Sequence, residues 1–154
     1  MNEDLRPFGN PGSEEFRVDA YPFYLLNRTV SRYNTVIEAH LRPLGLEIPA
    51  WRVLMILGET EPLPIAQIAK TAVINLSTMM RIVERMTRAG LVEAAPSPSD
   101  GRVTELRLTK EGHVALAAAR RATAPIYEKI IQGFSATDFG RLLKLLDRLH
   151  ANLG

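Results

Sequence analysis

The 154-residue sequence contains no cysteine. Disulfide bonds, thiol nucleophiles, thiol redox sensors and thiolate metal sites are therefore excluded, and the composition fits a reducing compartment. Long hydrophobic runs are also missing, since no stretch approaches the roughly 20 apolar residues of a membrane-spanning helix. The N-terminal stretch MNEDLRPFGNPGSEEFRVD is acidic and broken by proline and glycine, unlike a signal peptide. We therefore expect a soluble, cytoplasmic protein with no membrane partner.

Motifs for catalysis and metal binding are also lacking. There is no phosphate-binding glycine loop, and His40, His113 and His150 stand far apart. None of them has the H-x-x-x-H or H-E-x-x-H spacing of a metal site. We therefore expect no enzymatic activity, no catalytic residue, no cofactor and no metal ligand in the sequence pattern. A zinc-responsive regulator whose ligands are gathered only by folding stays open as an alternative.

Positive charge is concentrated in the middle of the chain. Residues 1–63 carry six basic and nine acidic side chains, whereas residues 64–110 carry seven and four. Residues 111–154 carry six basic and four acidic side chains, so the whole chain has a net charge of only +2. A basic central segment is typical of a surface that binds a polyanion.

Prolines and apolar periodicity divide the first half of the chain into helices. We expect a long helix over about 21–41, with Pro22 in its first turn, where a missing N–H costs nothing. The breakers of RPLGLEIP end this helix, and Pro49 starts the next one, PAWRVLMILGE. EPLP is predicted to be a turn, IAQIAKTA a short helix, and VIN another turn. The inward side chains of the short helix should be Ile65, Ile68 and Ala69.

The segment LSTMMRIVERMTRAG predicts a further helix that stops at Gly90 in a left-handed cap. On a helical wheel at about 100° per residue, one side is apolar: Leu76, Met79, Ile82, Val83 and Met86. The opposite side is polar and mostly basic: Ser77, Thr78, Arg81, Glu84, Arg85 and Arg88. Two short helices around a tight turn form a helix-turn-helix, in which small residues admit the base edges and arginines reach bases or phosphates. The predicted DNA contacts of this helix are Ser77, Thr78, Arg81, Arg85 and Arg88.

A hairpin follows this helix. LVEAA predicts a short strand, PSPSDG a turn, and RVTELRLT the returning strand, on which Thr104, Leu106 and Leu108 share one face. A two-stranded ribbon directly after a recognition helix is a wing, whose tip can lie in the adjacent minor groove. We place Arg102 there, with Asp100 pairing to fix its direction.

The sequence resembles the MarR family of winged helix-turn-helix regulators over about residues 20–154. The wing segment DGRVTELRLTKEG fits the family pattern of D-x-R, a short strand and L-T-x-x-G, and LGLEIPAWRVL and STMMRIVERMTRAGLV also match. The resemblance implies a mostly α fold with a small β-wing, in which long N- and C-terminal helices form a dimer. It also implies a ligand-responsive transcriptional regulator, a homodimeric repressor that binds a pseudo-palindromic operator in double-stranded DNA.

Three positions depart from the family pattern. Met80 stands where members often carry a polar residue, so we expect apolar contact there, for instance with a thymine methyl, in place of a hydrogen bond. Glu93, Ala94 and Ala95 occupy a strand that is often basic, and Gly101 replaces another basic position. The missing charges predict weaker non-specific DNA binding than is usual for the family.

Four regions follow from the resemblance and the pattern. We expect a flexible arm over residues 1–19, a first dimerisation helix with its connection over 20–48, a DNA-binding lobe over 49–110 and C-terminal dimerisation helices over 111–154. A helix over 110–133 should kink at Pro125.

Capping residues mark the starts of the C-terminal helices. Thr109 is predicted to cap the helix over 110–133. Ser135 with Asp138 resembles a capping box that opens a final helix. The apolar stripe of that helix, expected to pack between subunits, is Phe139, Leu142, Leu143, Leu146 and Leu149.

The resemblance also implies a small-molecule effector between the dimer helices and the DNA-binding lobe. The candidate pocket residues are Tyr24, Arg28 and Trp51. An arginine beside aromatic rings suits a small aromatic or acidic effector, such as an aromatic carboxylate or an aromatic acyl-coenzyme A thioester. A winged helix that binds only proteins is the other alternative, although such a surface should expose aromatics rather than the basic face of residues 77–88.

Overall fold

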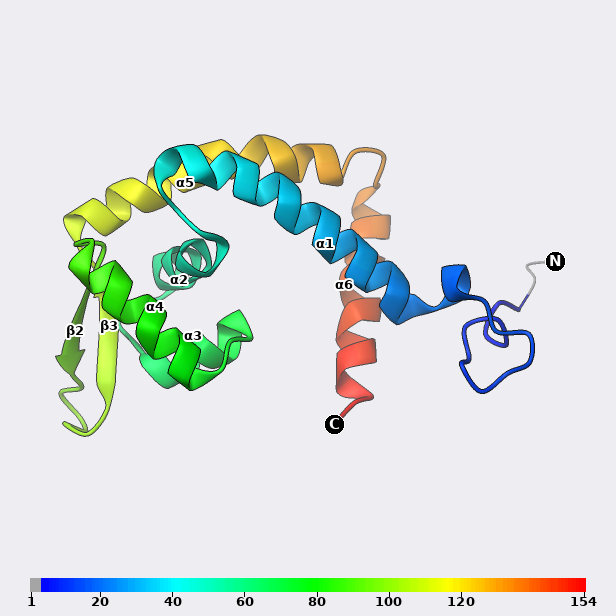
Figure 1. The fold of residues 1–154 in the computed structure, drawn as a ribbon, viewed down its shortest axis with the longest axis horizontal. Coiled ribbons are helices and arrows are strands. Elements are labelled where there is room, and N and C mark those ends of the chain that lie inside the picture. The colour runs from blue at the N-terminus through cyan, green and yellow to red at the C-terminus, as the bar shows by residue number, and fades with distance from the viewer. Residues whose placement is uncertain (1–3) are drawn as a thin grey trace.

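The computed structural model describes residues 4–154, and helices dominate it (Figure 1). The elements in chain order are η1 (Val18–Ala20), α1 (Pro22–Leu41), η2 (Arg42–Leu44), α2 (Ile48–Glu59), β1 (Leu63–Pro64), α3 (Ile65–Ala72), α4 (Leu76–Arg88), β2 (Val92–Pro96), β3 (Thr104–Leu108), α5 (Lys110–Ile130) and α6 (Ala136–Ala151). The predicted arm begins in residues 1–3, which lie outside the described residues, and residues 4–17 form turns ahead of η1. The predicted helices are confirmed, with boundaries shifted by a few residues at most.

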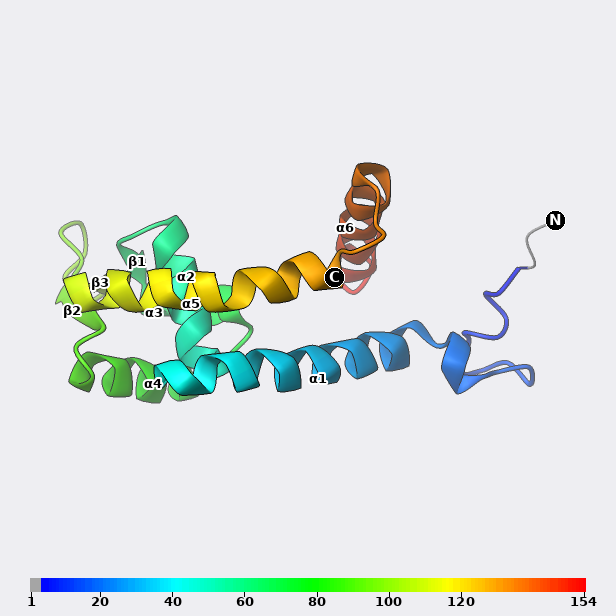
Figure 2. The ribbon, with the colours of Figure 1, turned by 90° about the horizontal axis from the view of Figure 1, so that it is seen from above.

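Two long helices join the two ends of the molecule. α1 and α5 pack against each other, and α2 packs on both of them. Figure 2 shows α1 and α5 running side by side, with the α2–α4 helices and the sheet at one end. At the other end α6 turns away from α5 and stands apart from the α2–α4 helices (Figures 1 and 2). The described chain thus has a compact lobe at one end and a projecting helix at the other.

The predicted helix caps are confirmed. Thr109 caps α5 by accepting a hydrogen bond from the Gly112 N–H, and Ser135 with Asp138 forms the capping box of α6. α5 continues through Pro125 and ends at Ile130, three residues before the predicted end at 133. Gly90 has a φ of 74° after α4, as predicted for a left-handed cap.

The sheet has three antiparallel strands in the order β1-β3-β2. β2 and β3 form the predicted hairpin, in which Ala94 pairs with Leu106. The prediction that EPLP is only a turn was wrong, because Leu63 and Pro64 pair with β3 as a third strand. A strand of only two residues is too short to show an alternation of apolar and polar side chains in the sequence. Their pairing is set by tertiary contact with β3, at an edge where proline is tolerated.

The core lies where α1, α2, α3, α4, α5 and β3 meet. Its fully buried side chains include Leu41, Leu54, Ile68, Met79 and Leu106. Met79, Ile82, Val83 and Met86 are buried as the wheel predicts, but Leu76 is exposed. Leu76 is the first residue of α4 and lies at the edge of the stripe, so its side chain extends beyond the core.

Gly112 allows α5 to approach the end of the recognition helix. A Cβ at this position would lie 2.0 Å from the carbonyl oxygen of Leu91. The same carbonyl accepts the Thr109 N–H at 3.1 Å, and the Thr109 hydroxyl donates to the Gly90 carbonyl at 2.6 Å. The L-T-x-x-G pattern therefore joins the start of α5 to the chain that leaves α4.

Candidate nucleic-acid interface and ligand cavity

α4 is held as the second helix of a helix-turn-helix. Its apolar side packs into the core, and a three-residue turn separates it from α3. Val73 begins this turn with a φ of 56°. Asn75 then caps α4 by accepting the Thr78 N–H at 2.8 Å and the Ser77 hydroxyl at 2.8 Å. The opposite side of α4 is left to solvent.

All five predicted DNA contacts of α4 are exposed, but their cations differ in environment. Arg85 lies 3.3 Å from Glu47, which ties α4 to the connection before α2. Arg88 forms an ion pair with Glu84 one turn earlier on the same helix. Within residues 4–154, Arg81 has no acidic side chain within ion-pair distance. Arg81 is therefore the α4 arginine that can bind a phosphate or base without first leaving a carboxylate.

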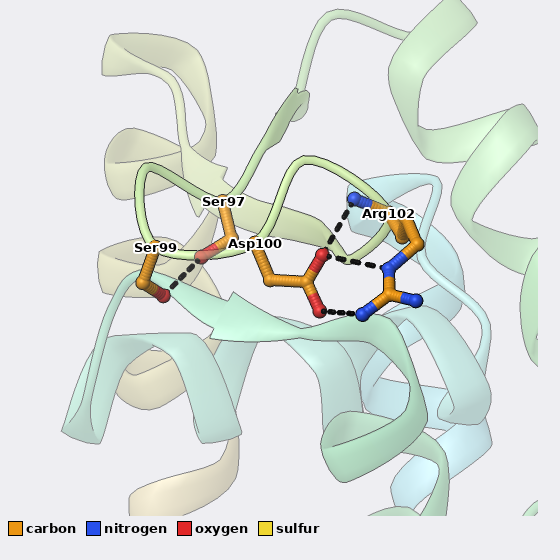
Figure 3. A network of polar contacts seen from close by, with 4 residues as sticks. All are labelled: Ser97, Ser99, Asp100 and Arg102. Carbon is orange, nitrogen blue, oxygen red and sulfur yellow. Dashed lines mark hydrogen bonds and ion pairs between the residues drawn. The ribbon is translucent and has the colours of Figure 1, made fainter.

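The wing tip is a polar network (Figure 3). The Asp100 carboxylate accepts hydrogen bonds from the Arg102 backbone N–H and from its guanidinium, all at 3.1–3.2 Å. This pairing lowers the pKa of Asp100. The Ser97 N–H donates to the Val103 carbonyl at 2.7 Å, which closes the turn beneath the pair. The predicted pairing of Asp100 with Arg102 is confirmed.

The strand β2 adds no net positive charge to the wing. Glu93 lies 3.9 Å from Arg107 on β3, so the two charges face each other across the ribbon. Ala94 and Ala95 are exposed beside them. Arg102, in the turn between β2 and β3, keeps 92% of its side chain exposed although it pairs with Asp100 in the same turn.

A cavity of about 410 Å³ lies between α1, α2 and α5. Its lining is Tyr33, Ile37, Trp51, Met55, Arg120, Thr123, Ala124, Tyr127 and Ile130. Most of this wall is aliphatic or aromatic. The Thr123 hydroxyl is already used, because it donates to the Ala119 carbonyl at 2.8 Å.

The cavity wall contains polar groups that a ligand can bind. Trp51 is 9% exposed, and its buried Nε1 has no hydrogen-bond partner among the described residues. The exposed Arg120 guanidinium supplies a positive charge at the wall. Burial raises the pKa of the Tyr33 phenol above its ordinary value. An apolar cavity with a few placed polar groups is the usual form of a small-molecule site.

The structure divides the predicted effector residues into two places. Trp51 lines the cavity, whereas Tyr24 and Arg28 lie on the exposed N-terminal half of α1, outside its lining. The Arg28 guanidinium is 5.7 Å from the centre of the Tyr24 ring, a cation–π pair. Sequence reasoning missed Arg120 and Tyr127, which are seven residues apart and so fall on one face of α5.

His113 makes a contact with Glu61 near the sheet. His113 Nε2 lies 3.1 Å from Glu61 Oε1, and the other oxygen of Glu61 accepts the Leu108 N–H at 2.7 Å. In the part of the chain that the structure describes, no three His, Asp or Glu side chains come together as a metal site would require. Over the same residues, no helix has the length and apolarity to span a membrane.

Comparisons with known proteins agree with this architecture. The crystal structure of a MarR-family transcriptional regulator from Silicibacter pomeroyi matches with a TM-score of 0.80 and 26% identity, covering 90% of this chain and 93% of that one. CouR from Rhodococcus jostii RHA1 bound to p-coumaroyl-CoA also matches with a TM-score of 0.80, at 22% identity, covering 86% of this chain and 94% of that one. A structure of CouR bound to a 23-mer DNA duplex also matches.

Sequence similarity is more extensive still. The HTH-type transcriptional repressor IacR of Pseudomonas putida is 38% identical over 144 residues, which cover 94% of this chain and 86% of IacR. The model of the MarR family matches residues 44–103, from the end of η2 through the wing turn. The winged helix with its exposed basic α4, together with this similarity, shows that the chain belongs to the MarR family of DNA-binding transcriptional regulators.

Proposed function

We propose that the protein is a homodimeric repressor that binds a pseudo-palindromic operator and is released by a small aromatic acid. The cavity between α1, α2 and α5 carries this proposal. Its apolar wall, the unpartnered Trp51 Nε1 and the Arg120 guanidinium are complementary to an aromatic ring with an anionic group. Because α2 and α5 also pack against the sheet and each other, a ligand there touches the frame of the DNA-binding lobe.

The operator contacts in this proposal come from α4 and the wing. Ser77, Thr78 and Arg81 enter the major groove, Arg85 and Arg88 approach the phosphates, and Arg102 reaches the neighbouring minor groove. IacR, the relative reported above, is named a transcriptional repressor, and a structure exists of the repressor CouR bound to a DNA duplex. Both observations support repression by direct DNA binding.

The dimer contacts come from the projecting end of the molecule. No residue of α6 is buried within the described chain, although its stripe includes Leu142, Leu143 and Leu146, all at least 38% exposed. The Tyr127 ring on α5 meets the Phe139 ring on α6 at 6.3 Å, which fixes the base of the helix but leaves its length uncovered. A second copy supplies the missing cover, and a two-fold axis places two recognition helices roughly 34 Å apart.

The effector enters as an anion with an aromatic body. Its carboxylate pairs with Arg120, and an oxygen accepts the hydrogen bond that Trp51 Nε1 does not make within the chain. CouR has been crystallised with p-coumaroyl-CoA, so an aromatic acyl thioester is the second ligand class to test. Either ligand releases DNA only if it binds the DNA-incompetent arrangement of the lobes more tightly.

The first experiment is a fluorescence anisotropy titration against DNA from upstream of the protein's own gene, with a scrambled duplex as control, at two salt concentrations. We expect preference for the native duplex and steep weakening as salt rises. Equal, weak binding to both would indicate a distant operator. Absence of any binding, with or without zinc, would favour the protein-interaction alternative.

The second experiment uses the single tryptophan as a reporter. Because Trp51 lines the cavity, its fluorescence should change on titration with benzoate, hydroxycinnamate and their coenzyme A thioesters. Arg120→Met should abolish the response to the free acids. Arg121→Met, at the neighbouring exposed position outside the lining, is the matched control and should leave it unchanged. Equal responses in both variants would exclude Arg120 as the anion site.

A further inference from the structure

Three large apolar side chains, two on α4 and one in the turn before it, are exposed and not used by the fold. Val73 in the turn is 88% exposed, Leu76 is 51% exposed and Met80 is 50% exposed. We call these three residues the apolar edge. Leu76 and Met80 are one helical turn apart, so they lie next to each other on the surface of α4. An apolar surface at this place is unexpected, since solvent-exposed positions of a helix are normally polar.

Val73 adds a second and independent observation. Its φ of 56° lies in the left-handed region, where a β-branched residue is strained and glycine or asparagine is favoured. Burial of its side chain cannot explain why valine stands there, because the side chain is almost fully exposed. The left-handed backbone itself caps α3, because the Val73 N–H donates to the Ala69 and Lys70 carbonyls. This cap accounts for the conformation but not for an exposed valine in it.

The surroundings of the apolar edge indicate what covers it. Ser77 and Arg81, each next to a member of the edge, are exposed on the same helix, and Arg85 and Arg88 follow. The partner must therefore be polyanionic and yet present small apolar groups. Duplex DNA does so in its major groove, where the 5-methyl group of thymine is the apolar feature of the base edges.

We propose that the apolar edge reads thymine methyl groups, so that the operator carries thymine at the positions beneath Leu76 and Met80. This proposal rests on the proposed insertion of α4 into the major groove. Sequence preference would then come from methyl contacts on one edge of the helix, while Arg81 on the neighbouring row supplies affinity through phosphates or guanine. The Val73 side chain, in the turn before α4, adds to this apolar contact on the N-terminal side of the helix.

The test replaces thymine by deoxyuridine, which pairs identically with adenine and lacks only the methyl group. An operator is first obtained by selection from a randomised duplex pool, and each half-site is then synthesised with single and combined replacements. We expect affinity to fall about fourfold for each methyl that is read, from the value of one buried carbon. Unchanged affinity for every replacement, with specific binding intact, would overturn the proposal and leave the proposed function standing. Failure of the selection itself would instead contradict DNA binding.

Variants assign the effect to residues. Met80→Gln and Leu76→Ala should weaken binding to the thymine operator but cause no further loss on the corresponding deoxyuridine operator. Val73→Gly removes the side chain while relieving the strained backbone, so its fold should be preserved. Arg81→Ala is the matched control, because it should weaken binding to both operators by the same factor. Additive losses for Met80→Gln and deoxyuridine would show that the side chain and the methyl do not meet, which would also overturn the proposal.

Discussion

The Asp100 carboxylate holds the Arg102 guanidinium by two side-chain hydrogen bonds of 3.1 and 3.2 Å across a single intervening glycine. The arginine is nonetheless 92% exposed, so the pair orients the cation without shielding it. An exposed ion pair of this kind adds little to folding stability. Its effect should therefore appear in DNA binding.

Asp100→Ala tests this directly, because charge and geometry predict opposite results. Removing a negative charge from the wing should strengthen binding to DNA if only electrostatics mattered. We expect weaker binding, by about fivefold, because Arg102 must then be ordered during association at a cost of about 1 kcal/mol. Anisotropy titrations at matched salt measure the change, with Arg102→Ala as the reference loss. Tighter binding of Asp100→Ala would refute the orienting role.

Arg81→Ala and Arg88→Ala should differ although each removes one positive charge from α4. Arg88 is paired with Glu84, whereas Arg81 has no carboxylate partner in residues 4–154. We expect Arg81→Ala to lose roughly 1–3 kcal/mol of binding free energy and about one unit of salt slope. The loss for Arg88→Ala should be clearly smaller. Equal losses would mean that long-range charge alone accounts for binding by this helix.

Gly112→Ala should destabilise the fold. The added Cβ would lie 2.0 Å from the Leu91 carbonyl oxygen, and backbone cannot give way as a flexible side chain does. We expect a loss of about 2 kcal/mol or more in the free energy of unfolding, measured by urea denaturation. Gly140→Ala, at a helical position with nothing within 4 Å of its Cβ, is the control and should be neutral or slightly stabilising. A stability for Gly112→Ala like that of the control would show that α5 does not approach Leu91 so closely.

The cap of α6 should depend on pH in a defined direction. Hydrogen bonds from the Ser135 hydroxyl and backbone N–H lower the pKa of Asp138 below its ordinary value of 3.8. The cap is therefore complete at neutral pH and is lost as the pH falls through this lowered pKa. Carboxyl ¹³C shifts should place the Asp138 midpoint below 3.8, and Ser135→Ala should move it upward. A midpoint that Ser135→Ala leaves in place would argue against the capping box.

Local signals in the sequence predicted the helices and the hairpin well. Proline at helix starts, Gly90 after α4, and the caps at Thr109 and Ser135 act through neighbouring backbone, so they can be recognised without the fold. The third strand could not be recognised in this way, because Leu63 and Pro64 become a strand only by pairing with β3. Leu76 is exposed although the wheel places it on the apolar side, because periodicity does not show where the core ends.

The same distinction between local and tertiary signals applies to the candidate site. The contacts of α4 and the wing follow from one helix face and one turn, and Asp100 and Arg102 are only two residues apart. The cavity instead combines Tyr33, Trp51 and Arg120 from three helices that are distant in sequence. Aromatic and cationic residues close together on one helix, Tyr24 and Arg28, were a poor guide to it because they bind each other at the surface.

The hydrogen bonds of Thr109 with Gly90 and Leu91 have a consequence for how this family can change. They join the two ends of the hairpin at its base, so residues 92–108 leave and re-enter the helical scaffold at nearly one point. Lengthening, shortening or exchanging the wing tip between Pro96 and Thr104 need not disturb the register of α4 or α5. The wing is in this sense an interchangeable part, and grafting the tip of another regulator onto this base offers a route to new operator preferences without redesign of the protein that carries it.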